Sequence, residues 1–214
     1  MSLLDEIRQY VIDGNQEQTQ QLVRQALMDK LPPEQILKEG LISAMTEVGR
    51  RFECAEFYVP EMLVSARAMK GGLAILRPYL AEANVQAVGR VVIGTVEGDL
   101  HDIGKNLVGI MLEGAGFEVI DLGTDVSAEK YAAAVKANLP QIVACSALIT
   151  TTMPYMQSVI STLQEAGLRG RVKVMVGGAP VNEKYAHEIG ADGYAPDAAA
   201  AAVCAKKLLS EMGK

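Results

Sequence analysis

Residues 90–104 have the sequence RVVIGTVEGDLHDIG, in which an apolar run is followed by a short polar segment. The apolar run is typical of a buried strand, and residues 105–112 after it have the pattern of a helix. His101, one of only two histidines in the chain, therefore falls in a loop at the carboxyl end of a strand, two residues after Asp99. A histidine in this position is suited to bind a metal with one ring nitrogen while a carboxylate holds the other.

The C-terminal part of the chain alternates short β-rich runs with helical runs, five times in succession. Strands that alternate with helices form a parallel sheet with helices on both faces. We therefore predict an α/β domain of the flavodoxin-like (Rossmann-type) class over residues 88–214. Its strands are expected at residues 90–96, 118–122, 142–146, 172–176 and 193–195, and its helices at 102–115, 127–138, 152–166, 182–189 and 197–212.

The first part of the chain, residues 1–86, has apolar residues at helical spacing throughout. Pro33 and Pro60 each suit the first turn of a helix. Four helices with short connections are predicted, which indicates a small four-helix bundle. The polar stretch at residues 81–90 is expected to link this bundle to the α/β domain.

The composition excludes several classes of partner. The formal net charge is −6, whereas nucleic-acid backbones attract clustered Lys and Arg, so no nucleic-acid partner is expected. There is no stretch of about 18 apolar residues, so we expect no membrane contact. Cys54, Cys145 and Cys204 lie far apart and lack zinc-site spacing. Free thiols of this kind favour a reducing, cytoplasmic location.

The unusual residue types of the C-terminal part lie in loops that follow predicted strands. The carboxyl ends of parallel strands meet at one edge of the sheet, where open α/β sheets bind ligands at the switch point between the first and third strands. The clustering therefore predicts a ligand site at this edge. The loops concerned are residues 97–104, 146–152, 177–180 and 194–196.

Two common ligand sites of this architecture fit the loops poorly. A phosphate or flavin site would need a loop of free amides, but Glu97, Asp99 and Asp102 would repel a phosphate. A phosphoacceptor receiver would need an aspartate at the end of the third strand, where Ser146 stands.

Three motifs at this edge resemble the cobalamin-binding domain, of the kind found in methionine synthase. They are D-x-H-x-x-G from Asp99, S-x-L from Ser146 and G-G at Gly177. The preceding half is similar to the helical cap of methyl-transferring corrinoid proteins, with Phe52 in V-G-x-x-F and Val59 in Y-V-P-E. The resemblance covers nearly the whole chain.

The resemblance implies a corrinoid bound base-off and His-on, with His101 as the lower ligand of cobalt and Asp99 accepting a hydrogen bond from the other ring nitrogen. Thr152 stands where the family often has a serine that extends this pair, and it keeps the hydroxyl. Phe52 and Val59 are implied to cover the upper, methyl-bearing face. The implied cofactor-binding residues are Gly98, Asp99, His101, Asp102, Ile103, Gly104, Ser146, Leu148, Thr150, Gly177, Gly178, Ala179, Tyr194, Ala195, Phe52 and Val59.

Purely structural interpretations of several of these residues stay open. Thr152 is a good helix cap before Pro154, and Ser146 and Thr150 are also potential caps. The glycine pair at 177–178 suits a tight turn. Phe52 and Val59 would also fit an ordinary bundle core.

The function implied by the resemblance is that of a methyl carrier in one-carbon metabolism, such as methanogenesis or acetogenesis. Its expected partners are a substrate-specific corrinoid methyltransferase, a second methyltransferase that passes the group to tetrahydrofolate or coenzyme M, and a reductive activation protein. The chain alone is expected to show little turnover. Two alternatives are a cobalamin-dependent sensor or regulator and the small cobalamin subunit of a mutase.

Overall fold

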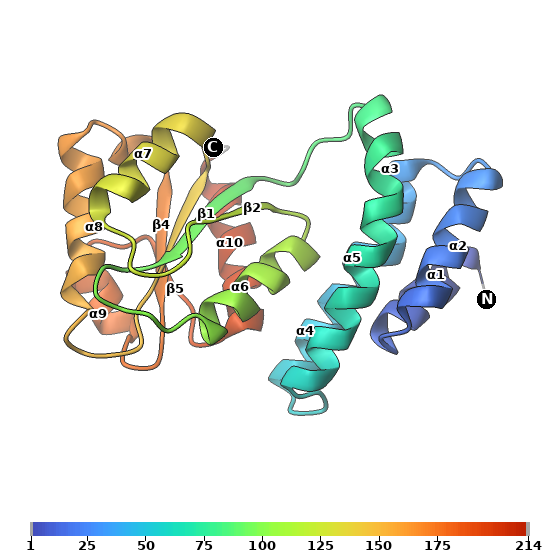
Figure 1. Ribbon diagram of the computed structural model, residues 1–214, viewed down its shortest axis with the longest axis horizontal. Helices are drawn as coiled ribbons and strands as arrows, with labels where there is room; N and C mark the ends of the chain where they lie inside the picture. Colours follow the sequence, from blue (N-terminus) through green and yellow to red (C-terminus); the bar gives the residue numbers. More distant parts are fainter. Residues whose placement is uncertain (1, 213–214) are drawn as a thin grey trace. The chain divides into compact units, whose positions relative to one another are not determined.

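The computed structural model describes residues 2–212. The chain divides between Ala87 and Val88 into a helical unit and an α/β unit (Figure 1). In the described part of the chain, no helix combines the length and hydrophobicity needed to cross a bilayer.

The helical unit contains four helices in space, as the sequence predicts. The third is assembled from α3, η1 and α4, which follow one another without a break, and its middle section is a π-helix that the sequence pattern does not indicate. A capping box between Ser2 and Asp5 begins the first helix. The bounds are α1 Leu3–Ile12, α2 Gln16–Met28, α3 Pro33–Gln35, η1 Ile36–Ile42, α4 Ser43–Glu53 and α5 Val59–Glu82.

The core of the helical unit consists of apolar side chains that repeat at helical spacing. A buried polar contact ties α5 to α1, because the Ser65 hydroxyl donates to the backbone oxygen of Ile12 at 2.9 Å. This bond satisfies a hydroxyl that would otherwise be costly to bury. The largest fully buried side chains are Ile7, Val11, Ile36, Leu41, Met45, Met62 and Leu76.

The α/β unit is a five-stranded parallel sheet in the order β2-β1-β3-β4-β5, which confirms the predicted fold class. Helices α7, α8 and α9 lie on one face, and α6 and α10 on the other (Figure 1). Each predicted element is present within two residues of its expected ends. The bounds are β1 Arg90–Thr95, α6 Ile103–Gly114, β2 Glu118–Asp121, α7 Ala128–Asn138, β3 Ile142–Ser146, α8 Pro154–Glu165, η2 Arg169–Arg171, β4 Lys173–Gly177, α9 Glu183–Glu188, β5 Gly193–Tyr194 and α10 Ala198–Met212.

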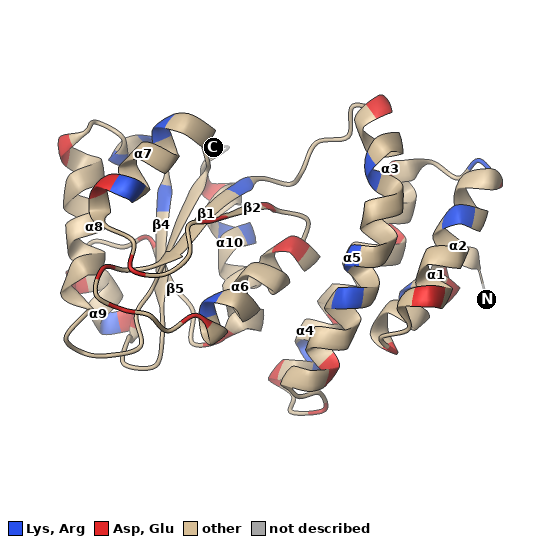
Figure 2. Cartoon of the chain, in the orientation of Figure 1, with Lys and Arg blue, Asp and Glu red and all other residues tan. Residues whose placement is uncertain are grey.

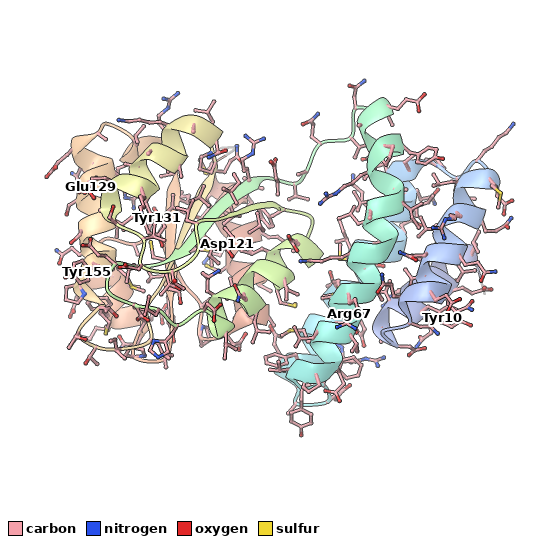
Figure 3. The ribbon with its side chains drawn as sticks, in the orientation of Figure 1. Tyr10, Arg67, Asp121, Glu129, Tyr131 and Tyr155 are labelled. Carbon is pink, nitrogen blue, oxygen red and sulfur yellow. The ribbon has the colours of Figure 1, made fainter. Side chains whose placement is uncertain are left out.

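One face of the sheet packs against α7, α8 and α9 in a continuous apolar core. Val92, Val143 and Val174 of three neighbouring strands belong to it, together with Tyr131 of α7, which is fully buried (labelled in Figure 3). Since successive strand residues point to opposite faces, the residues between them face α6 and α10. The last residues of each strand therefore also point to opposite faces of the sheet.

The strand order places the loop after β1 beside the loop after β3. Thr95 and Ser146 are partners in the parallel register, and the Val96 amide continues the pairing by donating to the Ser146 oxygen at 3.0 Å. This is the switch point at which the connections leave β1 and β3 toward opposite faces of the sheet. Residues 97–102 and 147–152 are therefore neighbours in space although about 50 residues separate them.

Gly94 in the middle of β1 provides a test of the packing under this edge. A Cβ at this position would lie 2.7 Å from the phenol oxygen of Tyr131. Gly94→Ala is expected to lower the free energy of unfolding by about 1–3 kcal/mol, because the buried ring has no room to move. In a Tyr131→Phe background the same change should cost about 1 kcal/mol less. Urea denaturation of the four variants measures both quantities, and an equal cost in both backgrounds would contradict this packing account.

Candidate functional site

The site is organised around the carboxylate of Asp99, which is 1% exposed. Its Oδ1 lies 2.7 Å from Nδ1 of His101 and accepts from the His101 backbone amide at 3.1 Å. Its Oδ2 accepts from the Leu148 amide and from the Thr152 hydroxyl, both at 2.8 Å. One buried carboxylate therefore joins the loop after β1 to the loop after β3.

The environment of Asp99 favours its ionised form. Burial alone would raise the pKa of this carboxyl, but the hydrogen bonds from Leu148, His101 and Thr152 outweigh it and hold the pKa well below the usual value. Asp99 is therefore a carboxylate throughout the physiological range. An ionised carboxylate accepts hydrogen bonds only, so its short contact with His101 requires a proton on Nδ1.

That proton fixes the tautomer of the imidazole. With the hydrogen on Nδ1, the neutral ring of His101 has its lone pair on Nε2, the atom that ligates metals. The side chain is 54% exposed, whereas its Asp99 partner is covered. The end of β1 also restrains this loop, because the Thr95 hydroxyl donates to the His101 backbone oxygen at 2.8 Å. The structure thus provides a single oriented nitrogen donor at the surface.

Large apolar side chains are exposed on the loop that carries this imidazole and on the neighbouring loop after β3. Leu100 and Ile103 are 74% and 76% exposed, and Leu148 and Ile149 of the neighbouring loop are exposed as well. Exposed apolar groups gathered on two adjacent loops mark a binding surface. The loop after β1 also carries acidic residues, coloured red in Figure 2. A single imidazole in apolar surroundings suits a metal that brings its other ligands in a flat organic ring.

Three of the glycines implied to bind the cofactor fall into two groups. Gly178 has φ +127°, and a Cβ there would lie 1.9 Å from the Ala147 oxygen; a Cβ at Gly177 would lie 3.0 Å from the Ala195 oxygen. These two glycines are explained by the packing of the loops against each other, beyond the plain tight turn. A Cβ at Gly104 would meet open space. Gly104 is therefore the glycine whose small size leaves room above the surface.

Thr152 is placed by its hydroxyl and not by helix capping. Helix α8 begins at Pro154 after Met153, without a side-chain cap. The Thr152 hydroxyl instead contacts Asp99 and the Ile149 backbone oxygen, the latter at 2.9 Å. The capping alternative is therefore wrong for Thr152. The expected contact to Asp99 is present, while a role in proton relay stays a prediction.

The remaining predicted residues of the α/β unit lie at the same edge of the sheet, with different exposures. Ser146 is half-buried at the end of β3 and pairs in register with Gly177 of β4. Ala195 is buried beside Gly177. The exposed ones are Gly98, Asp102, Ile103, Gly104, Thr150 and Ala179.

The side chains of Tyr194 and Ser146 point to opposite faces of the sheet. Tyr194 pairs with Val176 and packs against the core under α7, α8 and α9. Ser146 points to the other face, because its neighbour Cys145 belongs to that core. Tyr194 and Ser146 therefore lie on opposite faces of the sheet, and the role of Tyr194 in cofactor binding stays a prediction. The orientation of Tyr194 follows from the register of a strand only two residues long, which the sequence does not define.

Phe52 and Val59 belong to the helical unit, on either side of the turn between α4 and α5. Both are half-buried. Arg51 fixes this turn, because its guanidinium lies 5.1 Å from the centre of the Phe57 ring and pairs with Glu47 at 2.9 Å. Hydrogen bonds from Arg50 and Arg51 lower the pKa of Glu47 to about 2. The covering role of Phe52 and Val59 stays a prediction.

Sequence reasoning missed the contribution of the loop after β2. The Asp125 carboxylate accepts a hydrogen bond from the Gly98 amide at 2.7 Å. The Asp125 amide donates to the backbone oxygen of Asp99 at 3.0 Å. Thr95 was also missed as a donor to His101. The available signal was positional, since this loop also leaves the carboxyl edge of the sheet.

Fold and site together define a cobalamin-binding type of protein, and comparison with known proteins agrees. A B12 binding domain family matches residues 89–203, and a second B12 binding domain family matches residues 3–77. The chain belongs to the family of corrinoid proteins that contain these domains.

Individual relatives share nearly the full length of the chain. A corrinoid protein of Desulfitobacterium hafniense is 42% identical over 99% of both chains. A dimethylamine corrinoid protein of Methanosarcina acetivorans is 42% identical over 97% of both. Among solved structures, the methanol:cobalamin methyltransferase complex of Methanosarcina barkeri contains a chain that is 30% identical with a TM-score of 0.87, covering 97% of this chain and 80% of that one.

The charge on Asp99 generates a pH-dependent prediction. Because the folded pKa lies below the usual value of 3.8, the stabilisation is fully present above that value and is lost as the pH falls through the folded pKa. Asp99→Asn should destabilise the cofactor-free protein by about 2 kcal/mol at pH 7. The gap between wild type and variant should shrink as the pH falls below about 4. Urea denaturation at pH 7, 5 and 3.5 measures the gap, and a pH-independent gap would contradict the assignment.

The Thr152 hydroxyl can be tested by a matched pair of variants. Thr152→Val keeps the shape and removes the donor, so it should raise the pKa of Asp99 and cost about 1–2 kcal/mol. Thr152→Ser keeps the hydroxyl and should leave the Asp99 pKa close to wild type. The carboxyl carbon resonance of Asp99, followed through an acid titration, reports this pKa. Equal values in the two variants would remove Thr152 from the network.

Proposed function

We propose that this protein binds a corrinoid through Nε2 of His101 and carries a methyl group between two methyltransferases. When bound, the corrinoid cobalt supplies the reactive centre that accepts and releases the methyl group. The observation that carries the proposal is the Asp99–His101 pair, which places a proton on Nδ1 and leaves Nε2 free to ligate. Full-length similarity to corrinoid proteins supports the carrier role and gives no support to a sensor or regulator.

Each group at the site has a task in this proposal. Asp99 and Thr152 hold the imidazole in one tautomer and one direction. Leu100 and Ile103 provide an apolar surface that excludes water beneath a flat ring. The hydroxyls of Ser146 and Thr150 are proposed to bind the nucleotide tail that a base-off corrinoid detaches from its cobalt. The residues proposed to border the cofactor are Gly98, Asp102, Gly104, Leu148, Gly177, Gly178, Ala179, Tyr194 and Ala195.

The proposed partners follow from the carrier role, in which other proteins act on the methyl donor and the methyl acceptor. A substrate-specific methyltransferase would deliver the methyl group, and a second one would pass it to tetrahydrofolate or coenzyme M. A reductive activation protein would restore oxidised cofactor. Phe52 and Val59 are proposed to shield the methyl-bearing face between these encounters. The free cysteines support a cytoplasmic location.

The second histidine provides a matched control for the test of this function. We expect wild type and His187→Ala, altered on the exposed face of α9, to bind hydroxocobalamin with the same absorption spectrum. His101→Ala should lose the His-on spectrum. After reduction, electron paramagnetic resonance of protein labelled with ¹⁵N-histidine distinguishes a protein imidazole from the cofactor's own base. If the label leaves the nitrogen hyperfine splitting unchanged, His101 is not the ligand and the proposal fails.

A further inference from the structure

Asp125 contacts the loop after β1 on both sides of Asp99, although it belongs to the loop after β2. Its carboxylate Oδ1 accepts the Gly98 amide at 2.7 Å. Its backbone amide donates to the backbone carbonyl oxygen of Asp99 at 3.0 Å. Two hydrogen bonds from one residue therefore bracket the peptide that carries the central carboxylate of the site.

The backbone fixes the position of Asp125 independently of its side chain. Val126 forms a parallel bridge with Val96, and the Val126 amide donates to the Thr95 oxygen at 3.0 Å. The Thr95 amide donates in turn to Gly123 at 3.0 Å. Asp125 itself has φ +53°, in the left-handed region that Asp tolerates better than most residues. The sheet edge thus holds this carboxylate in one place.

Gly98 has no side chain of its own to restrain it, whereas the Asp99 carboxylate beyond it is held by Leu148 and Thr152. Gly98 has φ +76° and lacks a side chain, so rotation about its backbone would swing Asp99 and the attached imidazole. The Asp99 amide donates only at 3.2 Å, to Val96. A charge-assisted bond to the Gly98 amide resists this rotation, because charged acceptors bind amides more strongly than neutral ones.

We propose that Asp125 is a positioning residue for His101. By holding Gly98 and Asp99, it sets the direction of the Asp99 carboxylate and therefore the direction of the His101 ring. The inference concerns the ligating imidazole and so rests on the proposed function, but the positioning itself is a property of the cofactor-free protein and is measurable there.

Three substitutions separate the carboxylate from the backbone conformation. Asp125→Gly removes the acceptor and accepts a positive φ without strain. Asp125→Asn keeps an acceptor oxygen and a residue that tolerates the left-handed region. Asp125→Glu keeps the charge and displaces it by one methylene. Circular dichroism and the melting temperature establish that each variant is folded. Should Asp125→Gly fail to fold, Asp125→Glu takes its place with the same expected direction.

The first readout uses the cofactor-free protein. In wild type we expect slow amide exchange at Gly98 and a ¹⁵N signature of His101 with the proton on Nδ1. Asp125→Gly should speed Gly98 exchange about tenfold, which is the equilibrium effect of losing one hydrogen bond to a charged acceptor. It should also move the His101 ring resonances toward a mixture of tautomers. Asp125→Asn should stay within about threefold of wild type.

The second readout uses protein loaded with cobalamin. The ratio of coordinated to dissociated imidazole, measured from the ¹⁵N hyperfine splitting after reduction, should fall about tenfold in Asp125→Gly and recover in Asp125→Asn. If Asp125→Gly matches wild type in both the ring resonances and this ratio, Asp125 does not position His101. If wild type itself shows no coordinated imidazole, the proposed function fails, and the cofactor-free readout still decides the role of Asp125.

Discussion

The buried carboxylate of Asp99 is the constraint on which the rest of the site depends. An ionised group out of contact with water is costly unless hydrogen bonds replace its hydration. The donors come from His101 in its own loop and from Leu148 and Thr152 in another. These two loops become neighbours only because β1 and β3 pair in parallel at the centre of the sheet. The strand order is therefore a requirement of the site, and the site adds to the cohesion of that edge.

The loop that carries the imidazole has no regular structure, so its shape is set by bonds from three neighbouring segments. Thr95 holds the backbone oxygen of His101 from the end of β1, Asp125 holds Gly98 from the loop after β2, and Leu148 holds Asp99 from the loop after β3. Each contact joins a side chain to backbone, the arrangement that loops use where no ladder is available. The exposed imidazole is thus connected to the rigid sheet through covered groups.

The sequence predicted those features that depend on local pattern. In the α/β unit, alternating periods predicted the helices and strands to within two residues. The spacing of Asp99 and His101 predicted their contact, which is observed at 2.7 Å. Features that depend on long-range register were not predictable. The side of the sheet that Tyr194 faces follows from the pairing of a two-residue strand. The contact of Asp125 with Gly98 depends on the left-handed backbone of Asp125, in a loop that has no periodic sequence pattern. The π-helix at 36–42 leaves the helical pattern of apolar residues almost unchanged, so periodicity does not reveal it.

A site with one protein ligand demands more orientation than a site with several. In a cage, each ligand restrains the others, whereas a lone imidazole must keep its direction through its own supporting contacts. Ordering a free side chain on each binding event costs about 0.5–1.5 kcal/mol, and a ring already held by Asp99 avoids most of that cost. The hydrogen bonds of the site act on Nδ1, and the exposed apolar side chains lie on the same loop and on its neighbour. Under the proposed function, Nε2 and these side chains would meet the ring of the cofactor.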